Sequence, residues 1–381
     1  MTKLQPKLRF PEFTINWEEK KLKEIGRFIG GGTPSTKKLD FWKGNIPWIS
    51  SSDLSDESIY KINISRYITN EAILQSATKL IPKNSILIVS RVGVGKVVIN
   101  TIELCTSQDF TNLTPYYDNY LFIAYLIKVK TNKLLDFNQG TSIKGFVKSD
   151  LEDLLIAIPT LHEQTKIANF LTAIDERLQA LHQKKSLLEQ YKKGVMQQIF
   201  NQELRFKQED GSDFPDWEEK KFDEIFEPIP SKKFQIQSNE IKDYGKYEVV
   251  DQGKKMIAGY SDKENSLFRN IPVILFGDHT TVLKYIDFEF IVGADGTKLL
   301  KNKSGNLKYL YYNLLFNNVE QEGYKRHFTI LSEKYLQIPS PPEQQKIANF
   351  LTIIDEKINK VTQQIELTQT YKKGLLQQMF C

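Results

Sequence analysis

The sequence predicts an α+β protein in which two globular modules are separated by a pair of long antiparallel coiled-coil helices, in a pseudo-twofold, circular organisation. Residues 163–200 and 343–380 are nearly the same sequence, with about half of the positions identical and no gap. Both stretches place apolar residues at heptad spacing. A shorter repeat, at residues 17–21 and 217–221 (WEEKK), precedes two regions that share little sequence. The chain is therefore built twice.

Composition narrows the class of protein. The 381 residues are enough for two or more domains, and 40% hydrophobic content can supply packed cores. The net charge of +5 is compatible with a polyanionic partner. Apolar runs such as Ile86–Val89 are far shorter than the ~18 residues of a membrane helix, and the N-terminus lacks an apolar signal core. Cys105 and Cys381 form no zinc-binding spacing. We expect a cytoplasmic, reduced protein without metal or membrane contact.

Each long repeat predicts one helix of about 35 residues, or ~50 Å at 1.5 Å per residue. Thr160 with Glu163, and Ser340 with Glu343, predict a capping box at each helix start. The apolar positions advance by alternating steps of four and three residues, which predicts a coiled-coil seam. The first seam consists of Ile167, Leu171, Ile174, Leu178, Leu181 and Leu188, and the second of Ile347, Leu351, Ile354, Ile358, Val361 and Ile365.

An apolar seam needs a partner in water. Two similar seams favour packing on each other as an antiparallel pair, although each helix packing on its own module is the alternative. Lys185 stands where the second seam has Ile365, and it could snorkel, pair with an acid or face a partner. Both helices also carry Tyr-Lys-Lys-Gly, at 191–194 and 371–374. The glycine there indicates a kink, a close contact or a tolerated cost of about 1 kcal/mol.

The two variable regions, about 26–158 and 226–338, have parallel layouts. Each has short β-like runs, an aromatic-rich helix (Tyr120–Phe137 or Leu307–Val319), a basic glycine-containing loop and a final run ending in Ile-Pro. Leu-Arg-Phe at 8–10 recurs at 204–206, directly after the first long helix. The N-terminus therefore resembles what would follow the second helix, so the order of elements is circular.

Several catalytic motifs match only in part. Residues 28–32 fit a loose S-adenosylmethionine pattern, but no Asn-Pro-Pro-aromatic partner exists, and we expect a turn at 30–32. Residues 93–96 resemble half of a phosphate loop, but the required flanking residues are absent, which favours a β-turn between strands. Residues 215–220 resemble a nuclease motif with too short a spacing. His279 has no nucleophile elbow beside it. We predict no catalytic, cofactor or metal site in this chain.

Polar residues in the variable regions remain as candidates for contact with nucleic acid. Lysine and arginine can neutralise phosphates, arginine can also bind guanine in two places, and small polar side chains can read base edges. The competing interpretation of each is an ordinary solvated residue. The candidate DNA-binding residues are Arg91, Lys96, Gln108, Thr141, Ser142, Lys144 and Lys148 in the first region, and Gln252, His279, Lys284, Lys298, Lys325, Arg326 and His327 in the second.

With these motifs the chain resembles the specificity subunit of type I restriction–modification enzymes. The resemblance covers nearly all 381 residues and rests on three features: the doubled helix EQxKIAxFL…IDE…YKKG…QQ(I/M)F, the head LRF…WEEKK, and two dissimilar modules. Residues 32–35, 46–50 and 140–145 look like common phrases of target-recognition domains. Residues 252–296 are similar to another recurring type.

The resemblance implies a non-catalytic role in DNA recognition. Each target-recognition domain would read half of a bipartite site in double-stranded DNA, and the helix pair would set the gap between the halves. Two methyltransferase subunits, carrying S-adenosylmethionine and modifying adenine, would dock on the helices and repeated parts. Two restriction subunits, which are motor–nucleases using ATP and Mg²⁺, would join them.

The implied domains divide the chain into six segments. They are a head (1–25), recognition domain 1 (26–158), the central long helix (159–200), a second head or linker (201–225), recognition domain 2 (226–338) and the distal long helix (339–381). The main alternative is a stand-alone duplicated DNA-binding or scaffold protein without an enzyme partner. A fused methyltransferase is a second alternative, which the missing catalytic tetrapeptide disfavours.

Overall fold

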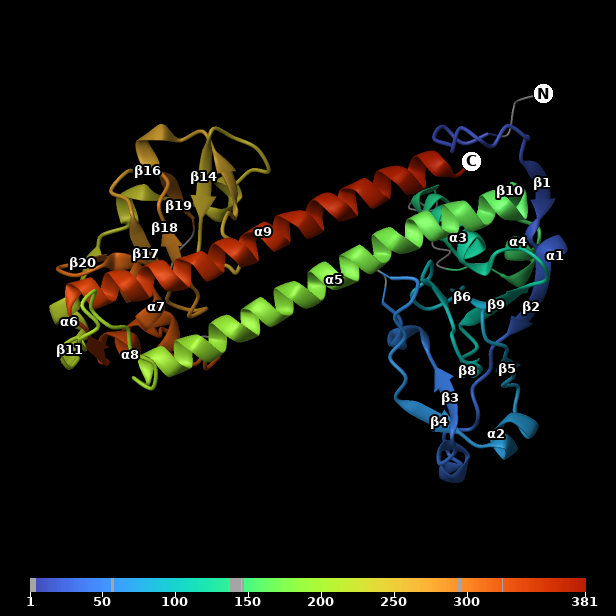
Figure 1. The fold of residues 1–381 in the computed structure, drawn as a ribbon, viewed down its shortest axis with the longest axis horizontal. Coiled ribbons are helices and arrows are strands. Elements are labelled where there is room, and N and C mark those ends of the chain that lie inside the picture. Colours follow the sequence, from blue (N-terminus) through green and yellow to red (C-terminus); the bar gives the residue numbers. More distant parts are fainter. Residues whose placement is uncertain (1–4, 56–57, 138–144, 146, 294–295, 324) are drawn as a thin grey trace. The chain divides into compact units, whose positions relative to one another are not determined.

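The structure, a computed structural model, describes residues 5–55, 58–137, 145, 147–293, 296–323 and 325–381, with the backbone alone for 132–137. The chain forms two compact units (Figure 1). The first unit consists of Met1–His182 and Gln363–Cys381, and the second of Gln183–Thr362. The second unit is one continuous segment, whereas the first is completed by the end of the chain.

Within the described residues, the first unit contains two four-stranded sheets and a two-stranded ribbon. One sheet has the order β2-β9-β6-β7, the other β4-β3-β8-β5, and the ribbon pairs β1 with β10. The strands are β1 Glu18–Lys21, β2 Gly26–Gly30, β3 Ile46–Ile49, β4 Arg66–Ile68, β5 Leu80–Ile81, β6 Ile86–Val89, β7 Val97–Ile99, β8 Leu104–Thr106, β9 Phe110–Pro115 and β10 Leu155–Ile158. The helices are α1 Leu22–Ile25, α2 Asn70–Leu74, α3 Tyr120–Phe137, α4 Lys148–Glu152 and the first half of α5 Leu161–Phe200.

The second unit repeats this design. Its sheets have the orders β12-β20-β17-β18 and β13-β19-β14-β15, with β16 also on β19, and its ribbon pairs β11 with β21. The strands are β11 Glu218–Lys221, β12 Phe226–Ile229, β13 Gln235–Ile236, β14 Tyr247–Val250, β15 Gly259–Ser261, β16 Leu267–Phe268, β17 Val273–Gly277, β18 Leu283–Ile286, β19 Phe290–Gly293, β20 Thr297–Asn302 and β21 Tyr335–Ile338. The helices are α6 Phe222–Ile225, α7 Leu307–Phe316, α8 Phe328–Ser332 and the first half of α9 Pro341–Met379.

The two units share one topology although their variable sequences differ. β2-β9-β6-β7 matches β12-β20-β17-β18, and the parallel pair β3–β8 matches the parallel pair β14–β19. Among the described residues, the strand β13 is the addition in the second unit. Two modules of like fold are therefore confirmed, while helix α7 ends at Phe316 rather than at Val319. There Asn317 closes the helix through its side-chain amide, which donates to the carbonyl oxygen of Asn313 at 3.1 Å.

The repeated Trp-Glu-Glu-Lys-Lys segments form the β1–β10 and β11–β21 ribbons. Glu18 lies opposite Ile158, and Glu218 lies opposite Ile338, so each segment closes its unit beside the Ile-Pro that precedes a long helix. Residues 218–220 of the nuclease-like match thus lie in β11, in line with the structural role expected for this segment.

The capping-box prediction is wrong at the glutamates. The buried Glu163 carboxylate accepts hydrogen bonds from the Arg9 guanidinium (2.7 Å) and the Trp17 indole (3.2 Å). In the second unit Glu343 accepts from Arg205 (2.9 Å) and Trp217 (3.1 Å). The hydroxyl of Ser340 is buried without a hydrogen-bond partner, so it does not cap the helix. Each glutamate instead anchors the head to the helix, because its carboxylate accepts hydrogen bonds from the arginine and tryptophan of the head and not from the N-cap backbone.

Each unit packs the start of one long helix against the end of the other. In the first unit Ile167 and Leu171 of α5 share a hydrophobic core with Leu375 and Met379 of α9. In the second unit Val195 and Ile199 of α5 share a core with Ile347 and Leu351 of α9. The antiparallel pairing of the long helices is therefore seen within each unit. None of the described helices is long and apolar enough to cross a membrane.

The predicted seam positions are the less exposed positions of both helices. Ile167, Leu171, Ile174, Ile347, Leu351, Ile354, Val361 and Ile365 are buried, whereas Leu178, Leu181, Leu188 and Ile358 are half-buried. The Lys185 side chain is 33% exposed and lies 4.0 Å from Glu189 on its own helix. This lysine therefore keeps its charge near water instead of filling the seam.

The structure corrects the expected turn at residues 30–32 and shows the surroundings of the helix glycines Gly194 and Gly374. Residues 31–32 run on from β2 instead of turning, because their N–H groups donate to the carbonyl oxygens of Phe110 (3.2 Å) and Thr106 (2.8 Å). A Cβ on Gly31 would lie 1.9 Å from the carbonyl oxygen of Ser107. Only glycine permits this close approach. At Gly194 and Gly374 the helices continue, and nothing lies within 4 Å of the position that a Cβ would take. The described residues therefore give these two glycines no packing role.

The circular order of elements is visible at the chain ends. The backbone N–H of Leu8 donates to the carbonyl oxygen of Gln378 at 2.9 Å, as Leu204 N–H donates to Gln198 at 3.0 Å. The N-terminal head thus follows α9 in space as the second head follows α5 in sequence. Five residues separate Gln198 from Leu204, and joining Cys381 to Pro6 would leave the same number between Gln378 and Leu8.

We therefore predict that a circularly permuted chain folds normally. In this chain Cys381 is joined to Pro6, and the new ends lie between Gln202 and Glu203, which are both exposed. Permutation at exposed loops is well tolerated, so the thermal midpoint should stay within about 4 °C of the original. Calorimetry measures this, and a control permuted inside β17 should fail to fold. A permuted chain that unfolds like the control would contradict the circular arrangement.

Candidate nucleic-acid interface

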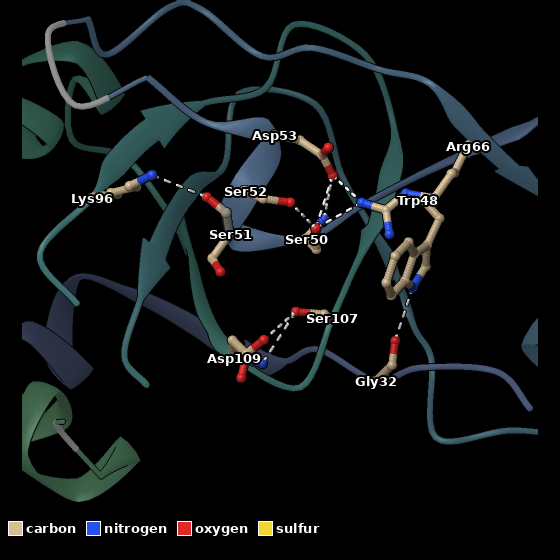
Figure 2. Close-up of polar contacts among 10 residues, drawn as sticks. All are labelled: Gly32, Trp48, Ser50, Ser51, Ser52, Asp53, Arg66, Lys96, Ser107 and Asp109. Carbon is tan, nitrogen blue, oxygen red and sulfur yellow. Dashed lines mark hydrogen bonds and ion pairs between the residues drawn. The ribbon is translucent and has the colours of Figure 1, made fainter. Parts of the chain in front are cut away.

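Loops of the first unit gather where strands β3, β6 and β8 end (Figure 2). We call residues 50–54, 90–96, 107–109 and 145 the first loop cluster. Arg66 holds its first loop: the guanidinium donates to the Ser50 hydroxyl at 2.6 Å and to the Asp53 carboxylate. The same guanidinium lies 4.6 Å from the centre of the Trp48 ring, a cation–π contact. Asp53 also accepts from the Ser50 N–H at 2.7 Å, which completes the turn.

The predicted contact residues Arg91 and Lys96 lie in the turn between β6 and β7. Lys96 donates to the carbonyl oxygens of Ser51 and Leu54, both at 3.2 Å, and so ties this turn to the loop after β3 (Figure 2). Arg91 is exposed. Lys96 therefore stabilises the contact between the two loops, whereas Arg91 is open to solvent.

The remaining part of the first loop cluster is joined by backbone and hydroxyl groups. Asp109 accepts from the Ser107 hydroxyl at 3.0 Å, and its carbonyl oxygen accepts from the Ser90 N–H at 2.8 Å. Gln108 is exposed beside them and accepts a hydrogen bond from the Thr33 hydroxyl. Gly145 lies against the end of β6, since its Cβ would be 2.9 Å from the carbonyl oxygen of Ser90.

Some predicted residues are not placed in this cluster. Thr141, Ser142 and Lys144 lie outside the described residues. Lys148 begins α4, is exposed and forms an ion pair with Glu152 at 3.1 Å.

The second unit has a matching arrangement, which we call the second loop cluster: residues 251–255, 277–282, 296 and 325–327. The Gln252 side-chain oxygen accepts from the His279 N–H at 3.2 Å, and its carbonyl oxygen accepts from the Thr280 hydroxyl at 2.6 Å. Gly296 completes the contact, because a Cβ there would lie 2.7 Å from the His279 ring. The loops after β14 and β17 therefore hold one another.

His327 is a structural residue of this cluster. It is buried, its Nε2 accepts from the Glu322 N–H at 3.1 Å, and its Nδ1 therefore donates to the carbonyl oxygen of Asp278 at 3.0 Å. The next residue, Phe328, donates its N–H to the Asp278 carboxylate at 2.8 Å. These bonds fix the segment before α8 on the loop after β17, as Gly145 meets Ser90 in the first unit.

Lys284 and His327 are corrections to the predicted set of contact residues. Lys284 is 3% exposed and donates to the carbonyl oxygens of Asp251, at 2.7 Å, and Lys255. Burial lowers the pKa of this ammonium, while the Asp251 carboxylate opposes that shift. Both side chains point into the fold because they satisfy buried loop carbonyls, so neither can reach DNA from these positions.

Three predicted cations of the second unit stay near the surface. Lys325 is exposed and pairs with Glu322 at 3.1 Å, and its carbonyl oxygen lies 3.1 Å from Nδ1 of His279. Arg326 is exposed, and Lys298 lies 5.5 Å from the centre of the Phe328 ring. The exposed charges of Lys325 and Arg326, beside well-fixed loops, suit contact with a charged ligand better than catalysis. The described residues contain no group of three potential metal ligands.

Sequence reasoning missed the residues that support the first loop cluster. Arg66 and Asp53 lie on different elements and form an ion pair, and Arg66 also lies over the Trp48 ring. No local spacing in the sequence predicts these contacts. In contrast, the repeated Asp-Glu of the long helices and the repeated Tyr-Lys-Lys-Gly were visible in both copies. In the structure their aspartates and lysines pair between the two helices, Asp175 with Lys372 and Asp355 with Lys192.

Comparison with known proteins gives the family. The family model described as the type I restriction modification DNA specificity domain matches residues 14–190 and, a second time, residues 215–369. The chain belongs to this family. The second match begins just before β11, so each copy of the specificity domain includes one ribbon, one pair of sheets and most of one long helix.

Curated relatives of this specificity-domain chain carry consistent names. The MjaIX specificity subunit of Methanocaldococcus jannaschii is 31% identical over 242 residues, which are 59% of this chain and 56% of the relative. The EcoR124I/EcoR124II specificity subunit of Escherichia coli is 35% identical over 177 residues, 44% of this chain and 43% of the relative. The chain thus spans about half the length of the curated relatives it matches.

Solved structures agree on the fold. A crystal structure of a type I restriction–modification S subunit from M. genitalium has a TM-score of 0.65 at 17% identity, over 99% of each chain. A chain from a study of complex assembly and conformational transition in a type I system has a TM-score of 0.54 at 16% identity, over 95% of each chain. These likenesses confirm the predicted α+β fold class of the specificity family.

Proposed function

We propose that this chain is the DNA sequence-recognition subunit of a type I restriction–modification complex. Each recognition domain reads one half of a bipartite site in double-stranded DNA, and the helix pair sets the gap between the halves. The observation that carries the proposal is that one topology occurs twice while the loops at corresponding places carry different side chains. A repeated framework with two different loop sets suits a reader of two different half-sites.

The proposed DNA contacts are exposed or half-buried polar residues, most of them in the two loop clusters, with Lys148 and Lys298 outside these clusters. Arginine and lysine would neutralise phosphates, and glutamine could read base edges. The surrounding hydrogen bonds hold these loops in fixed positions. This favours specific binding, because the loops lose little conformational entropy when they bind DNA. The proposed contacts are Arg91, Gln108 and Lys148 in the first unit, and Gln252, His279, Lys298, Lys325 and Arg326 in the second, with Lys96, Lys284 and His327 as supports.

The long helices are proposed to dock two methyltransferase subunits. Tyr191 and Tyr371 occupy the same place in the two repeats and are 53% and 55% exposed, and Leu187 and Leu367 precede them by one turn at 57% and 70%. An exposed apolar pair that occurs in both copies suits a partner that binds twice.

The catalytic groups would belong to partners in a cytoplasmic complex. In this proposal the methyltransferase subunits hold S-adenosylmethionine and modify adenine, and two restriction subunits use ATP and Mg²⁺. The chain itself is non-catalytic, with recognition domains at 26–158 and 226–338, long helices at 159–200 and 339–381, and heads at 1–25 and 201–225. The stand-alone DNA-binding or scaffold protein is the competing proposal.

Methylation sequencing of a methylation-free host tests the proposal. We expect the chain, expressed with a type I methyltransferase subunit from the same organism, to produce methyladenine at one split motif with a fixed gap, and the methyltransferase alone to produce none. The absence of any motif from a soluble, associated pair of proteins would refute the recognition role and favour the scaffold protein.

A further inference from the structure

Each unit contains the same three-residue contact between the long helices and a module. In the first unit the Asp175 carboxylate of α5 accepts from the Tyr125 hydroxyl of α3 at 2.6 Å and from the Lys372 ammonium of α9. Lys372 also lies 5.7 Å from the centre of the Tyr125 ring. We call this contact the first pin. It joins both helices and the module at one point.

The second unit repeats this contact with exchanged helices, and we call it the second pin. Asp355 of α9 accepts from Tyr312 of α7 at 2.7 Å and from Lys192 of α5 at 2.6 Å. The Lys192 ammonium lies 5.1 Å from the centre of the Tyr312 ring. The repeated Tyr-Lys-Lys-Gly motif thus supplies the lysine of both pins, and the repeated Ile-Asp-Glu motif supplies the aspartate.

The pins are largely withdrawn from water. The side chains of Lys372 and Asp175 are 12% and 11% exposed, and those of Lys192 and Asp355 are 18% and 30% exposed. Burial, together with the nearby aspartate, raises the pKa of Tyr125 and that of Tyr312. Both hydroxyls therefore keep their protons and remain donors to the carboxylates across the physiological pH range.

The pin lysines occupy seam positions. Lys192 follows Leu188 by four residues, and Lys372 follows Thr368 by four, so each takes the next a position of its heptad pattern. An aliphatic seam is repetitive, and a slip of one heptad again places apolar residues opposite one another. A lysine at a single a position removes this freedom, because only one register gives it a partner.

Both pins specify the same register. Facing residues of an antiparallel pair have a constant sum of residue numbers, and both Asp175 with Lys372 and Asp355 with Lys192 give 547. A slip of one heptad would place Lys372 opposite Ala168 or His182, and Lys192 opposite Ala348 or Thr362. None of these residues has a carboxylate, so the slipped registers leave both lysines without their acids.

We propose that the two pins fix the register of the helix pair and thereby select the gap between the half-sites. This inference rests on the proposed recognition function, since the gap has meaning only for a bipartite site. A slip of one heptad moves the helices by about 10 Å, which corresponds to about three base pairs of DNA at 3.4 Å each. The six pin residues are therefore positioning residues for gap selection, although they belong to no loop cluster.

The test replaces both pin lysines by an apolar residue. The pin variant is Lys192→Met with Lys372→Met, and the matched control is Lys193→Met with Lys373→Met, which changes the neighbouring exposed lysines and the net charge equally. We expect the original chain and the control to methylate one gap. The pin variant should methylate the same half-sites at a second gap, or lose at least tenfold of its methylation at the original gap.

A charge-swapped chain covers the case in which the pin variant is inactive. It combines Asp175→Lys with Lys372→Asp and Asp355→Lys with Lys192→Asp, and it should recover the original gap. Methylation by the pin variant at the original gap alone, at the original level, would overturn the proposal. Loss of methylation that the swap does not recover, in chains that melt like the control, would also overturn it.

A measurement without DNA separates this proposal from the recognition function. Spin labels at the exposed positions 184 and 369, in a chain with Cys381→Ser, report the register directly. We expect one label separation in the original chain and in the control, and a second separation, shifted by several ångströms, in the pin variant. An unchanged single separation would refute the register role. A failure to find any split motif with the original chain would instead refute the recognition function.

Discussion

Replacing Arg205 by alanine is expected to lower the free energy of unfolding by about 3–5 kcal/mol, because it leaves a buried carboxylate without its counter-ion. Glu343 is fully buried, and Arg205 gives it two hydrogen bonds, at 3.2 and 2.9 Å. The same guanidinium donates to the carbonyl oxygen of Pro215 at 2.7 Å, which holds the second head on α9. The Trp217 indole alone cannot replace this charge. Urea titration followed by circular dichroism measures the loss.

The matched control is Lys207→Ala. Lys207 lies on the same segment, but its pair with Asp213, at 3.4 Å, is 63% and 78% exposed. Exposed pairs contribute about 0–1 kcal/mol, so this variant should unfold almost as the original chain does. If Arg205→Ala loses no more than the control, the anchoring role of Glu343 is wrong.

Exchanging residues 26–158 for the corresponding module of another family member is expected to change one half-site and leave the other unchanged. Each mismatched base pair costs about 1–3 kcal/mol, so three or more changed bases should reduce methylation at the original half-site at least about a hundredfold. Methylation sequencing with the partner methyltransferase reads both half-sites in one experiment. Exchange of residues 226–338 is the control and should alter the other half-site.

Contacts of the first module with the head and the long helices show which residues a donor module needs. Phe122 packs on Trp17 and on Phe380 with ring centres 5.9 and 5.4 Å apart, and the Tyr125 hydroxyl completes the first pin. A donor with an aromatic residue in place of Phe122 and a tyrosine in place of Tyr125 should give an active hybrid. Unchanged specificity in an active hybrid would contradict the modular proposal.

The sequence predicted the framework well, because the framework depends on periodic and repeated patterns. The heptad spacing gave both long helices, and the aromatic-rich run gave α3 with the observed bounds. Some short apolar runs also became strands, such as Ile86–Val89 and Val97–Ile99, since a run bounded by turn-forming residues is a local signal. The duplicated head also gave the circular order that the Leu8–Gln378 bond displays.

The prediction of individual site residues was weaker, because burial and partners depend on distant segments. Lys284 looked like an exposed cation until the carbonyl oxygens of Asp251 and Lys255 were found around it. Glu163 looked like a capping residue, but Arg9, which is 154 positions away, takes its carboxylate. Nothing within a short window of sequence contains that information. Charge and spacing alone therefore cannot separate a loop support from a ligand contact.

The division of the first unit between the two ends of the chain has a consequence for the order of synthesis. Its core contains Leu375, Met379 and Phe380, which the ribosome makes after the whole of the second unit. The second unit is one continuous segment that ends at Thr362. During translation the second unit can therefore close first, although the first unit begins earlier. Until the final turns of α9 emerge, the nascent first unit exposes Ile167 and Leu171, and this is the interval in which a chaperone has an apolar surface to bind.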